Sequence, residues 1–205
     1  DSRFGSVAIQ SEGTIEGVKT NGTIVQGTIG WIGGIVGCAY DGIIKYCKNE
    51  INFTITNHHA TLYNNILGGI VARSDDDVQI YKCWNAGNLT LDIQDSPDSS
   101  PQGNSNGGIV GTGNWKTNLI KECANSGLIS TSYTNIVEGF APCSNVGFIV
   151  GDDYSVSDRS YNDEKYIIGS SSSFVCSESV LTLKILCINN DRYSTTRKIN
   201  AEDTS

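Results

Sequence analysis

The chain has 205 residues, of which 38% are hydrophobic and 18% charged, and its formal net charge is −8. This length allows one sizeable core, and 23 glycines with only 3 prolines are typical of a β-rich, turn-dense fold rather than a disordered chain. The acidic balance disfavours nucleic acid and anionic lipid as partners. No segment approaches the ~20 continuous apolar residues of a membrane-spanning helix, so no membrane insertion is expected in this segment.

The amino end and the cysteines predict a secreted protein. The chain begins at Asp1 and contains no methionine, so we expect a processed or truncated start. None of the cysteines forms a Cys-x-x-Cys pair, which argues against a zinc ribbon or a thioredoxin-like motif and favours extracellular disulfides. Because their number is odd, at least one cysteine is expected to remain a free thiol or to form a disulfide with another chain. The seven cysteines are Cys38, Cys47, Cys83, Cys123, Cys143, Cys176 and Cys187.

An internal repeat organises most of the chain. After a stretch of similar alternation at 13–25, the string Gly-Gly-Ile-Val-Gly at 33–37 recurs as Gly-Gly-Ile-Val-Ala at 68–72, again at 107–111, and more loosely at 146–151. Each of the first three copies is followed by an isoleucine, then a cysteine three residues later, then an asparagine two residues beyond. These residues are Ile44, Cys47 and Asn49; Ile80, Cys83 and Asn85; and Ile120, Cys123 and Asn125. We expect three short strands per repeat.

Such strands require stacking, because a short strand with one apolar face is not stable alone. We therefore expect an all-β fold, a single-domain parallel β-helix (β-solenoid) with right-handed winding. Equivalent residues would lie ~4.8 Å apart, so the isoleucines would form an apolar ladder and the asparagine amides would hydrogen-bond between coils. Isoleucine and cysteine three residues apart cannot both face inward on an ideal strand. A bulge or an outward cysteine is therefore predicted.

The expected solenoid occupies residues 1–151 in about five coils, at 13–32, 33–67, 68–106, 107–145 and from 146 onward. An irregular linker is expected at 152–175, and a terminal strand with a polar tail at 176–205. The alternating run at 180–188 either caps the open end of the stack or pairs with a neighbouring molecule. The three tryptophans lie next to strand corners, where core packing is the expected role. They are Trp31, Trp84 and Trp115.

The Gly-Gly-Ile-Val-Gly string with the later Cys-x-Asn resembles the GLUG-type repeats of bacterial and protist surface proteins, over roughly residues 13 to 151. The resemblance implies a parallel β-helix on a secreted or surface-anchored protein. It also implies a role in adhesion or surface architecture, and it transfers no catalytic residue.

Candidate modification sites follow from short motifs. Asn52, Asn88 and Asn21 begin Asn-x-Thr sequons, and alternation places Asn52 and Asn88 on the outer face. The stacked Cys47, Cys83 and Cys123 are expected either to form disulfides between adjacent coils or to pack as small hydrophobic residues. Cys176 and Cys187 are the favoured disulfide pair, with Cys38 and Cys143 as further candidates.

No metal site or cofactor is predicted. The acidic clusters at 75–77 and 152–153 lack the spacing of calcium loops, and the adjacent His58 and His59 are a poor metal pair. A β-helix enzyme that degrades polysaccharides is the third-ranked function, because 152–153 is the only superficial match to paired catalytic carboxylates.

The preferred function is a non-enzymatic extracellular structural glycoprotein. It would form a surface coat, appendage or filament by head-to-tail self-association into a homopolymer. The alternative is an adhesin module that binds glycans or a host surface through the loops at 56–65 and 94–106.

Overall fold

The computed structural model describes residues 2–26, 30–57, 65–94, 104–113, 119–134, 144–147, 149–153, 167–168, 171–172, 184–186, 188–189 and 192–193. These residues form β-strands and short connections and contain no helix. Their strand pairs are parallel, except for β24 (Ile188–Asn189) with β25 (Arg192–Tyr193). The expectation of an all-β fold is confirmed.

Sheets A and B contain the two strands that open each repeat. Sheet A has the order β1 (Ser2–Gly5), β5 (Gly30–Gly33), β9 (Ile66–Gly68), β14 (Asn104–Gly107), β19 (Ser144–Gly147) and β23 (Lys184–Leu186). Sheet B has the order β2 (Ala8–Ser11), β6 (Val36–Ala39), β10 (Val71–Ser74), β15 (Val110–Gly113) and β20 (Val150–Asp153). Neighbouring strands in each sheet therefore come from successive repeats.

Sheets C and D contain the strands that follow. Sheet C consists of β3 (Thr14–Glu16), β7 (Gly42–Lys45), β11 (Val78–Tyr81), β16 (Leu119–Lys121) and β21 (Ile167–Ile168). Sheet D begins with the long strands β4 (Lys19–Gln26) and β8 (Lys48–Asn57). It continues with β12 (Trp84–Asn85) and β13 (Leu89–Gln94), then β17 (Ala124–Asn125) and β18 (Ile129–Thr134), and ends with β22 (Ser171–Ser172).

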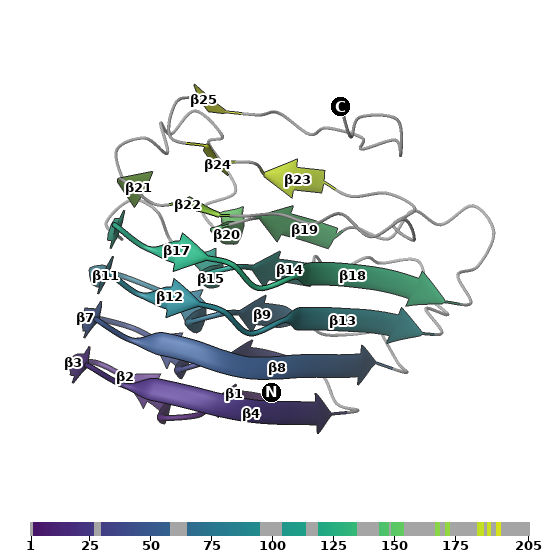
Figure 1. Ribbon diagram of the computed structural model, residues 1–205, viewed down its shortest axis with the longest axis horizontal. Coiled ribbons are helices and arrows are strands. Elements are labelled where there is room, and N and C mark those ends of the chain that lie inside the picture. The colour runs from purple at the N-terminus through teal and green to yellow at the C-terminus, as the bar shows by residue number, and fades with distance from the viewer. Residues whose placement is uncertain are drawn as a thin grey trace.

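The chain passes through sheets A, B, C and D in this order and then returns to sheet A, and we call each such pass a circuit. In Figure 1 sheet D faces the viewer, with the first circuit at the bottom and later circuits stacked above it. A circuit has four sheet positions, not the expected three strands. The missed position is sheet A, because its strands share no sequence pattern: β9 is apolar, whereas β14 is polar. Parallel strands in stacked sheets are compatible with a β-helix.

The corner between sheets C and D resolves the orientation of the isoleucine and the cysteine. Ile44 and Cys47 are both buried, as are their equivalents in the next two circuits. Neither a bulge nor an outward cysteine is present, so that prediction is wrong. Instead, the residue before each cysteine has a positive φ, which turns the chain between two strands and restores the inward direction. These corner residues are Tyr46 (φ 55°), Lys82 (φ 47°) and Glu122 (φ 54°), with Gly17 (φ 68°) in the first circuit.

The core lies between the sheets and consists of columns of equivalent side chains. One column contains Ile35, Ile70, Ile109 and Ile149, all 0% exposed. A second contains the register partners Ile44, Ile80 and Ile120, with Ile15 of the first circuit packed against the cluster. On the inner face of sheet D, Phe53 is buried and meets the Phe4 ring edge-on at 6.2 Å between centroids. Apolar contact between circuits therefore stabilises the stack.

The carboxyl-terminal third also contributes strands to the stack. Within 152–175, expected as a linker, β21 extends sheet C and β22 extends sheet D. Within the expected terminal strand, β23 pairs in parallel with β19 of the same chain at the edge of sheet A. The chain therefore covers part of this end of sheet A with its own residues.

Candidate assembly surface

The first circuit forms an open end of the stack. Its four strands are β1, β2, β3 and β4, and each is the last strand of its sheet. Among the described residues, each has a strand partner on one side only: β5, β6, β7 and β8, respectively. The other side of each strand presents backbone N–H and C=O groups to whatever lies beyond the circuit. Such edges are templates for pairing with a further strand.

Apolar side chains that are buried elsewhere are exposed at this end. Val7 continues the column of Ile35, since its N–H and that of Ala8 both donate to the Ile35 carbonyl. The side chain of Val7 is 46% exposed, whereas Ile35 is 0% exposed. Ile15 and Val18 are likewise only partly buried, although Ile44 and Cys47 above them are fully buried. Within the described residues this end is therefore an uncovered cross-section of the core.

The hydrogen bonds at the corner between sheets A and B define the direction in which the stack would continue. The N–H of Ile35 donates to Ile70 (2.9 Å), Ile70 donates to Ile109 (2.9 Å), and Ile109 donates to Ile149 (2.9 Å). Each circuit thus donates to the carbonyl of the next one. A further circuit placed against the open end would donate an N–H to the carbonyl of Val7.

Ile9 restricts what this end accepts. The register of β2 with β6 places Ile9 below Gly37, in a column that continues with Ala72, Gly111 and Gly151. A Cβ on Gly37 would lie 2.9 Å from the carbonyl oxygen of Phe4 in the circuit below. The larger side chain of Ile9, which is 58% exposed, would approach the equivalent atoms of an incoming circuit still more closely. An incoming end must therefore leave room for Ile9, so it cannot copy an inner circuit at this position.

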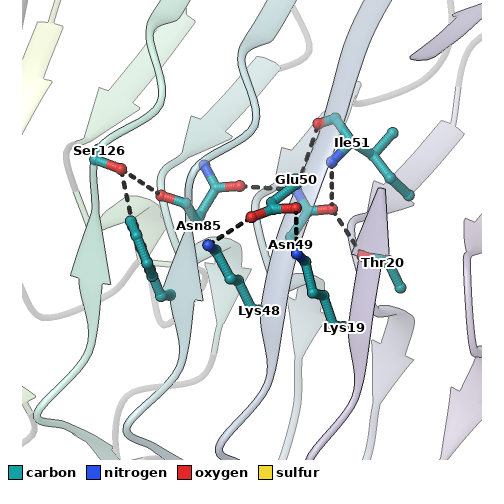
Figure 2. A network of polar contacts seen from close by, with 9 residues as sticks. Lys19, Thr20, Lys48, Asn49, Glu50, Ile51, Asn85 and Ser126 are labelled. Atoms are coloured by element: carbon teal, nitrogen blue, oxygen red, sulfur yellow. Dashed lines mark hydrogen bonds and ion pairs between the residues drawn. The ribbon is translucent and has the colours of Figure 1, made fainter. Parts of the chain in front are cut away.

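A column of asparagines joins the circuits inside sheet D (Figure 2). Asn49, Asn85 and Asn125 are register partners and are buried. The Nδ2 of Asn49 donates to Oδ1 of Asn85 at 2.7 Å, and Nδ2 of Asn85 donates to Oδ1 of Asn125 at 2.7 Å. Thr20 occupies this position in the first circuit, where its hydroxyl donates to Oδ1 of Asn49 at 3.0 Å. The column thus satisfies buried amides by bonds between circuits.

The neighbouring outer surface carries an ion-pair network (Figure 2). The carboxylate of Glu50 pairs with Nζ of Lys19, from the first circuit, at 2.9 Å and with Nζ of Lys48, from its own strand, at 2.5 Å. The hydrogen bond from Lys48, followed by that from Lys19, lowers the pKa of the Glu50 carboxyl. Because this cluster is open to solvent, its contribution to stability is small.

Four of the candidate disulfide cysteines are described, and all four are buried thiols: Cys38, Cys47, Cys83 and Cys123. The last three form a column in which the thiol of Cys83 points to the carbonyl of Ile44 at 3.5 Å, and that of Cys123 to Ile80 at 3.6 Å. They pack as small hydrophobic residues, and no disulfide joins them in the structure. Cys143, Cys176 and Cys187 lie outside the described residues.

The thiols of this column share hydrogen bonds along the stack. The hydrogen bond between Cys47 and Cys83, together with burial, raises the pKa of Cys47. The hydrogen bond to Cys123 raises the pKa of Cys83 to about 12, and the same contact lowers the pKa of Cys123. Burial raises the pKa of Cys38. Thiols that are buried in apolar surroundings are chemically inert.

We expect these four cysteines to resist alkylation by iodoacetamide at pH 8 in the folded protein and to react after unfolding in urea without reductant. Peptide mass spectrometry assigns each site separately. For each cysteine, labelling of the same peptide in the urea-unfolded protein is the internal control. A disulfide-linked peptide that contains any of the four, or rapid labelling of the folded protein, would contradict the expectation.

The sequon asparagines form a second column, on the outside of sheet D. Oδ1 of Asn52 accepts the N–H of Asn88 at 2.9 Å, and Oδ1 of Asn88 accepts the N–H of Leu128 at 3.0 Å. Both side chains are exposed, and their Nδ2 atoms form no hydrogen bond with the described residues. Asn21, in β4, is also exposed. The atom that carries an N-linked glycan is accessible in each case.

Trp84 does not have its expected core role. Trp84 is 43% exposed, because its register partners are Lys48 and Ala124 on the outer face of sheet D. Nζ of Lys48 lies over its indole ring, 3.8 Å from the ring centroid. The indole N–H donates a hydrogen bond to the hydroxyl of Ser126 at 2.8 Å. The core assignment of Trp84 is therefore wrong. Trp115 lies outside the described residues.

Trp31 is only partly buried and interacts with cations. The guanidinium carbons of Arg3 and Arg73 lie 4.4 and 4.6 Å from its ring centroid. Arg3 also donates to the hydroxyl of Tyr40 at 3.1 Å, and Arg73 pairs with Asp75 at 2.9 Å. These contacts tie sheets A and B together on their outer side.

The described ranges contain no group of three or more histidine, cysteine, aspartate or glutamate side chains arranged to hold a metal ion. His58 and His59 lie outside them, and of Asp152 and Asp153 only the backbone is described. In the part of the chain that was searched, no helix is both long and apolar enough to cross a membrane. No protein-family model, curated protein or solved structure matches the chain.

Proposed function

We propose that the chain is a β-solenoid that acts as a non-enzymatic structural building block of an extracellular coat, appendage or filament, assembled head-to-tail through the ends of its stack. The observation that carries this proposal is the open first circuit, where all four sheets end together and the core columns are exposed at Val7 and only partly buried at Ile15. A head-to-tail interface that does not close on itself produces filaments.

Right-handed winding is part of the proposal. In Figure 1 the strands β13 and β18 run to the right in front, while β14 and β19 run to the left behind them, and the chain climbs from the first circuit. This sense agrees with the general handedness of parallel crossovers. The resemblance to GLUG-type repeats supports the same architecture and a location at the cell surface.

Glycosylation at Asn52 and Asn88 belongs to the same proposal. The two side chains point outward from sheet D and leave Nδ2 accessible, whereas the open end lies on a different side of the molecule. Glycans at these positions would cover the face of sheet D without blocking the end. Asn21 is the third candidate, and its side chain points outward from β4, the edge strand of sheet D.

The experiment is electron microscopy of the native, unreduced protein with intact-mass analysis of the same sample. We expect filaments for the wild type and for Val25→Asp, and none for Val7→Asp. Both substitutions replace a partly exposed valine of the first circuit, but Val7 is in the core cross-section, whereas Val25, 75% exposed, is the partner of Thr54 on sheet D. Val7→Asp would place a carboxylate against an apolar partner surface.

Filaments that persist in Val7→Asp would reject the open end as the interface, and monomeric wild-type protein would reject head-to-tail assembly. Monomers that bind a carbohydrate would favour the adhesin alternative, which the exposed aromatic rings of Tyr46 and Trp84 support. The loops first expected to bind, at 56–65 and 94–106, lie largely outside the described residues.

A further inference from the structure

The two corners that border sheet C carry opposite charge. The described connections from sheet B to sheet C contain five acidic residues and no basic residue. We call this group the acidic edge: Glu12, Asp41, Asp75, Asp76 and Asp77. The corner between sheets C and D contains five of the nine lysines of the chain. We call this group the basic edge: Lys19, Lys45, Lys48, Lys82 and Lys121.

The basic edge stays positive after its internal ion pairs are counted. Within the described part of the chain its lysines pair with three carboxylates, so the local sum over these residues is 5 − 3 = +2 in a chain of net charge −8. These carboxylates are Glu16, Glu50 and Glu122. On the acidic edge Asp75 pairs with Arg73, and Glu12, Asp41 and Asp77 keep the edge negative.

The surface between the two edges is uncharged. The outward residues at the middle of the sheet C strands are Thr14, Ile43, Gln79 and Leu119, which are register partners of one another. Ile43 and Leu119 are only partly buried there. Sheet C forms the left side of the molecule in Figure 1 and is separate from sheet D, which carries the sequon asparagines. An uncharged strip between a negative and a positive edge is a self-complementary pattern.

We infer that the sheet C face binds a second copy of the same chain side by side. A twofold axis parallel to the stack turns the face onto itself and places the acidic edge of each copy opposite the basic edge of the other. This operation leaves every residue at its own height along the stack. Asp41 of one copy therefore meets Lys45 of the other in the second circuit, and Asp77 meets Lys82 in the third. A twofold axis across the stack would instead oppose like charges. The pairing is therefore lateral and parallel, independent of the proposed head-to-tail contact.

The size of the face predicts a weak contact between single chains. Four strands ~4.8 Å apart, each about 13 Å long, give roughly 250 Å² for the flat face, well below the ~800 Å² per partner of a stable complex. Charge complementarity then contributes much of the attraction, and the contact should be strongest at low ionic strength. If filaments form, repeated weak contacts along their length add up and would bundle them.

A charge-exchange experiment in the Val7→Asp background tests this inference without head-to-tail growth. One variant reverses the basic edge (Lys45→Glu with Lys82→Glu), and the other reverses the acidic edge (Asp41→Lys with Asp77→Lys). Sedimentation velocity in about 10 mM salt should show concentration-dependent dimers for the parent, at least about tenfold weaker association for each variant alone, and recovery when the two variants are mixed in equal amounts. About 0.3 M salt should disperse the dimers.

Recovery in the mixture is the decisive result, since general damage to either variant cannot restore association, and circular dichroism checks that each variant is folded. A parent that is monomeric at low salt overturns the inference. So do variants that associate as well as the parent, or a mixture that stays monomeric. Because the parent carries Val7→Asp, the absence of lateral dimers in this experiment leaves the head-to-tail proposal untouched. Likewise, failure of the wild-type protein to form filaments leaves the lateral pairing untouched.

Discussion

Replacing Asn85 with leucine should destabilise the protein by about 3 kcal/mol or more, although leucine matches the shape of asparagine closely. Asn85 accepts a hydrogen bond from Asn49 at 2.7 Å and donates to Asn125 at 2.7 Å and to the carbonyl of Gly87 at 3.0 Å. The substitution removes all three bonds and leaves the amide of Asn49 and the carbonyl of Gly87 without them in the core. Unsatisfied buried groups cost about 1–3 kcal/mol each.

The measurement is the urea midpoint followed by circular dichroism, with Asn88→Leu as the matched control. Asn88 also bonds between circuits, since its Oδ1 accepts the N–H of Leu128 at 3.0 Å, but it is exposed. Water replaces that bond, so the control should lose at most about 1 kcal/mol. Equal losses at both positions would mean that burial of the asparagine column contributes nothing.

Asn85→Asp adds a pH test of the same column. The introduced carboxylate would direct an oxygen at the Asn125 oxygen and at the Gly87 carbonyl, so its pKa should be raised in the folded state. A raised pKa means that stability is greatest below the unfolded value of ~3.9 and falls as pH rises through the folded value. The urea midpoint of this variant, relative to the wild type, should therefore increase on acidification, whereas that of Asn85→Leu should not.

Part of this arrangement follows directly from the sequence. The constant Ile-x-x-Cys-x-Asn spacing that follows each Gly-Gly pair predicts which residues share a column, and Ile44, Ile80 and Ile120 are register partners in the structure. The spacing is informative because insertions between the columns are confined to connections outside the strands. Alternation likewise predicts that Asn52 lies outside and Phe53 inside on sheet D, because side chains alternate along a strand.

Other features have no local signal. The sequence does not predict sheet A, because close approach of backbones, not a side-chain pattern, defines it. The sequence of β14, for example, is typical of an ordinary polar loop. The positive φ at Tyr46 and Lys82 was missed because these residue types rarely adopt it, and only the stack above and below holds them there. The open end was missed because exposure of Val7 depends on how the described circuits stack, which no local sequence pattern indicates.

The second large effect is expected for Gly68→Ala, which should prevent stable folding. A Cβ on Gly68 would lie 1.8 Å from the carbonyl oxygen of Val71 and 2.8 Å from the amide nitrogen of Gly111 in the next circuit. Both neighbours are backbone, so relief requires moving two circuits at once. Gly33 and Gly107 have the same 1.8 Å contact at the same corner, and an exceptional loss above about 4 kcal/mol is therefore expected.

Gly13→Ala is the matched control for this position. A Cβ there has no atom within 4 Å, and the backbone is not in the left-handed region, so the same chemical change should shift the urea midpoint negligibly or raise it slightly. Gly5→Ala provides a graded comparison: its Cβ would lie 2.0 Å from the carbonyl oxygen of Ala8, but the residue is in the terminal circuit.

Because circuits interact mainly with their neighbours, the first circuit can detach while the others remain folded. Gly5→Ala should therefore remove hydrogen-exchange protection from the first circuit alone, β1 to β4, whereas Gly68→Ala should remove it from every circuit. If Gly68→Ala folds with protection lost only in β9 and β10, the close backbone packing of this corner is local, and the stack does not depend on it for its cooperativity.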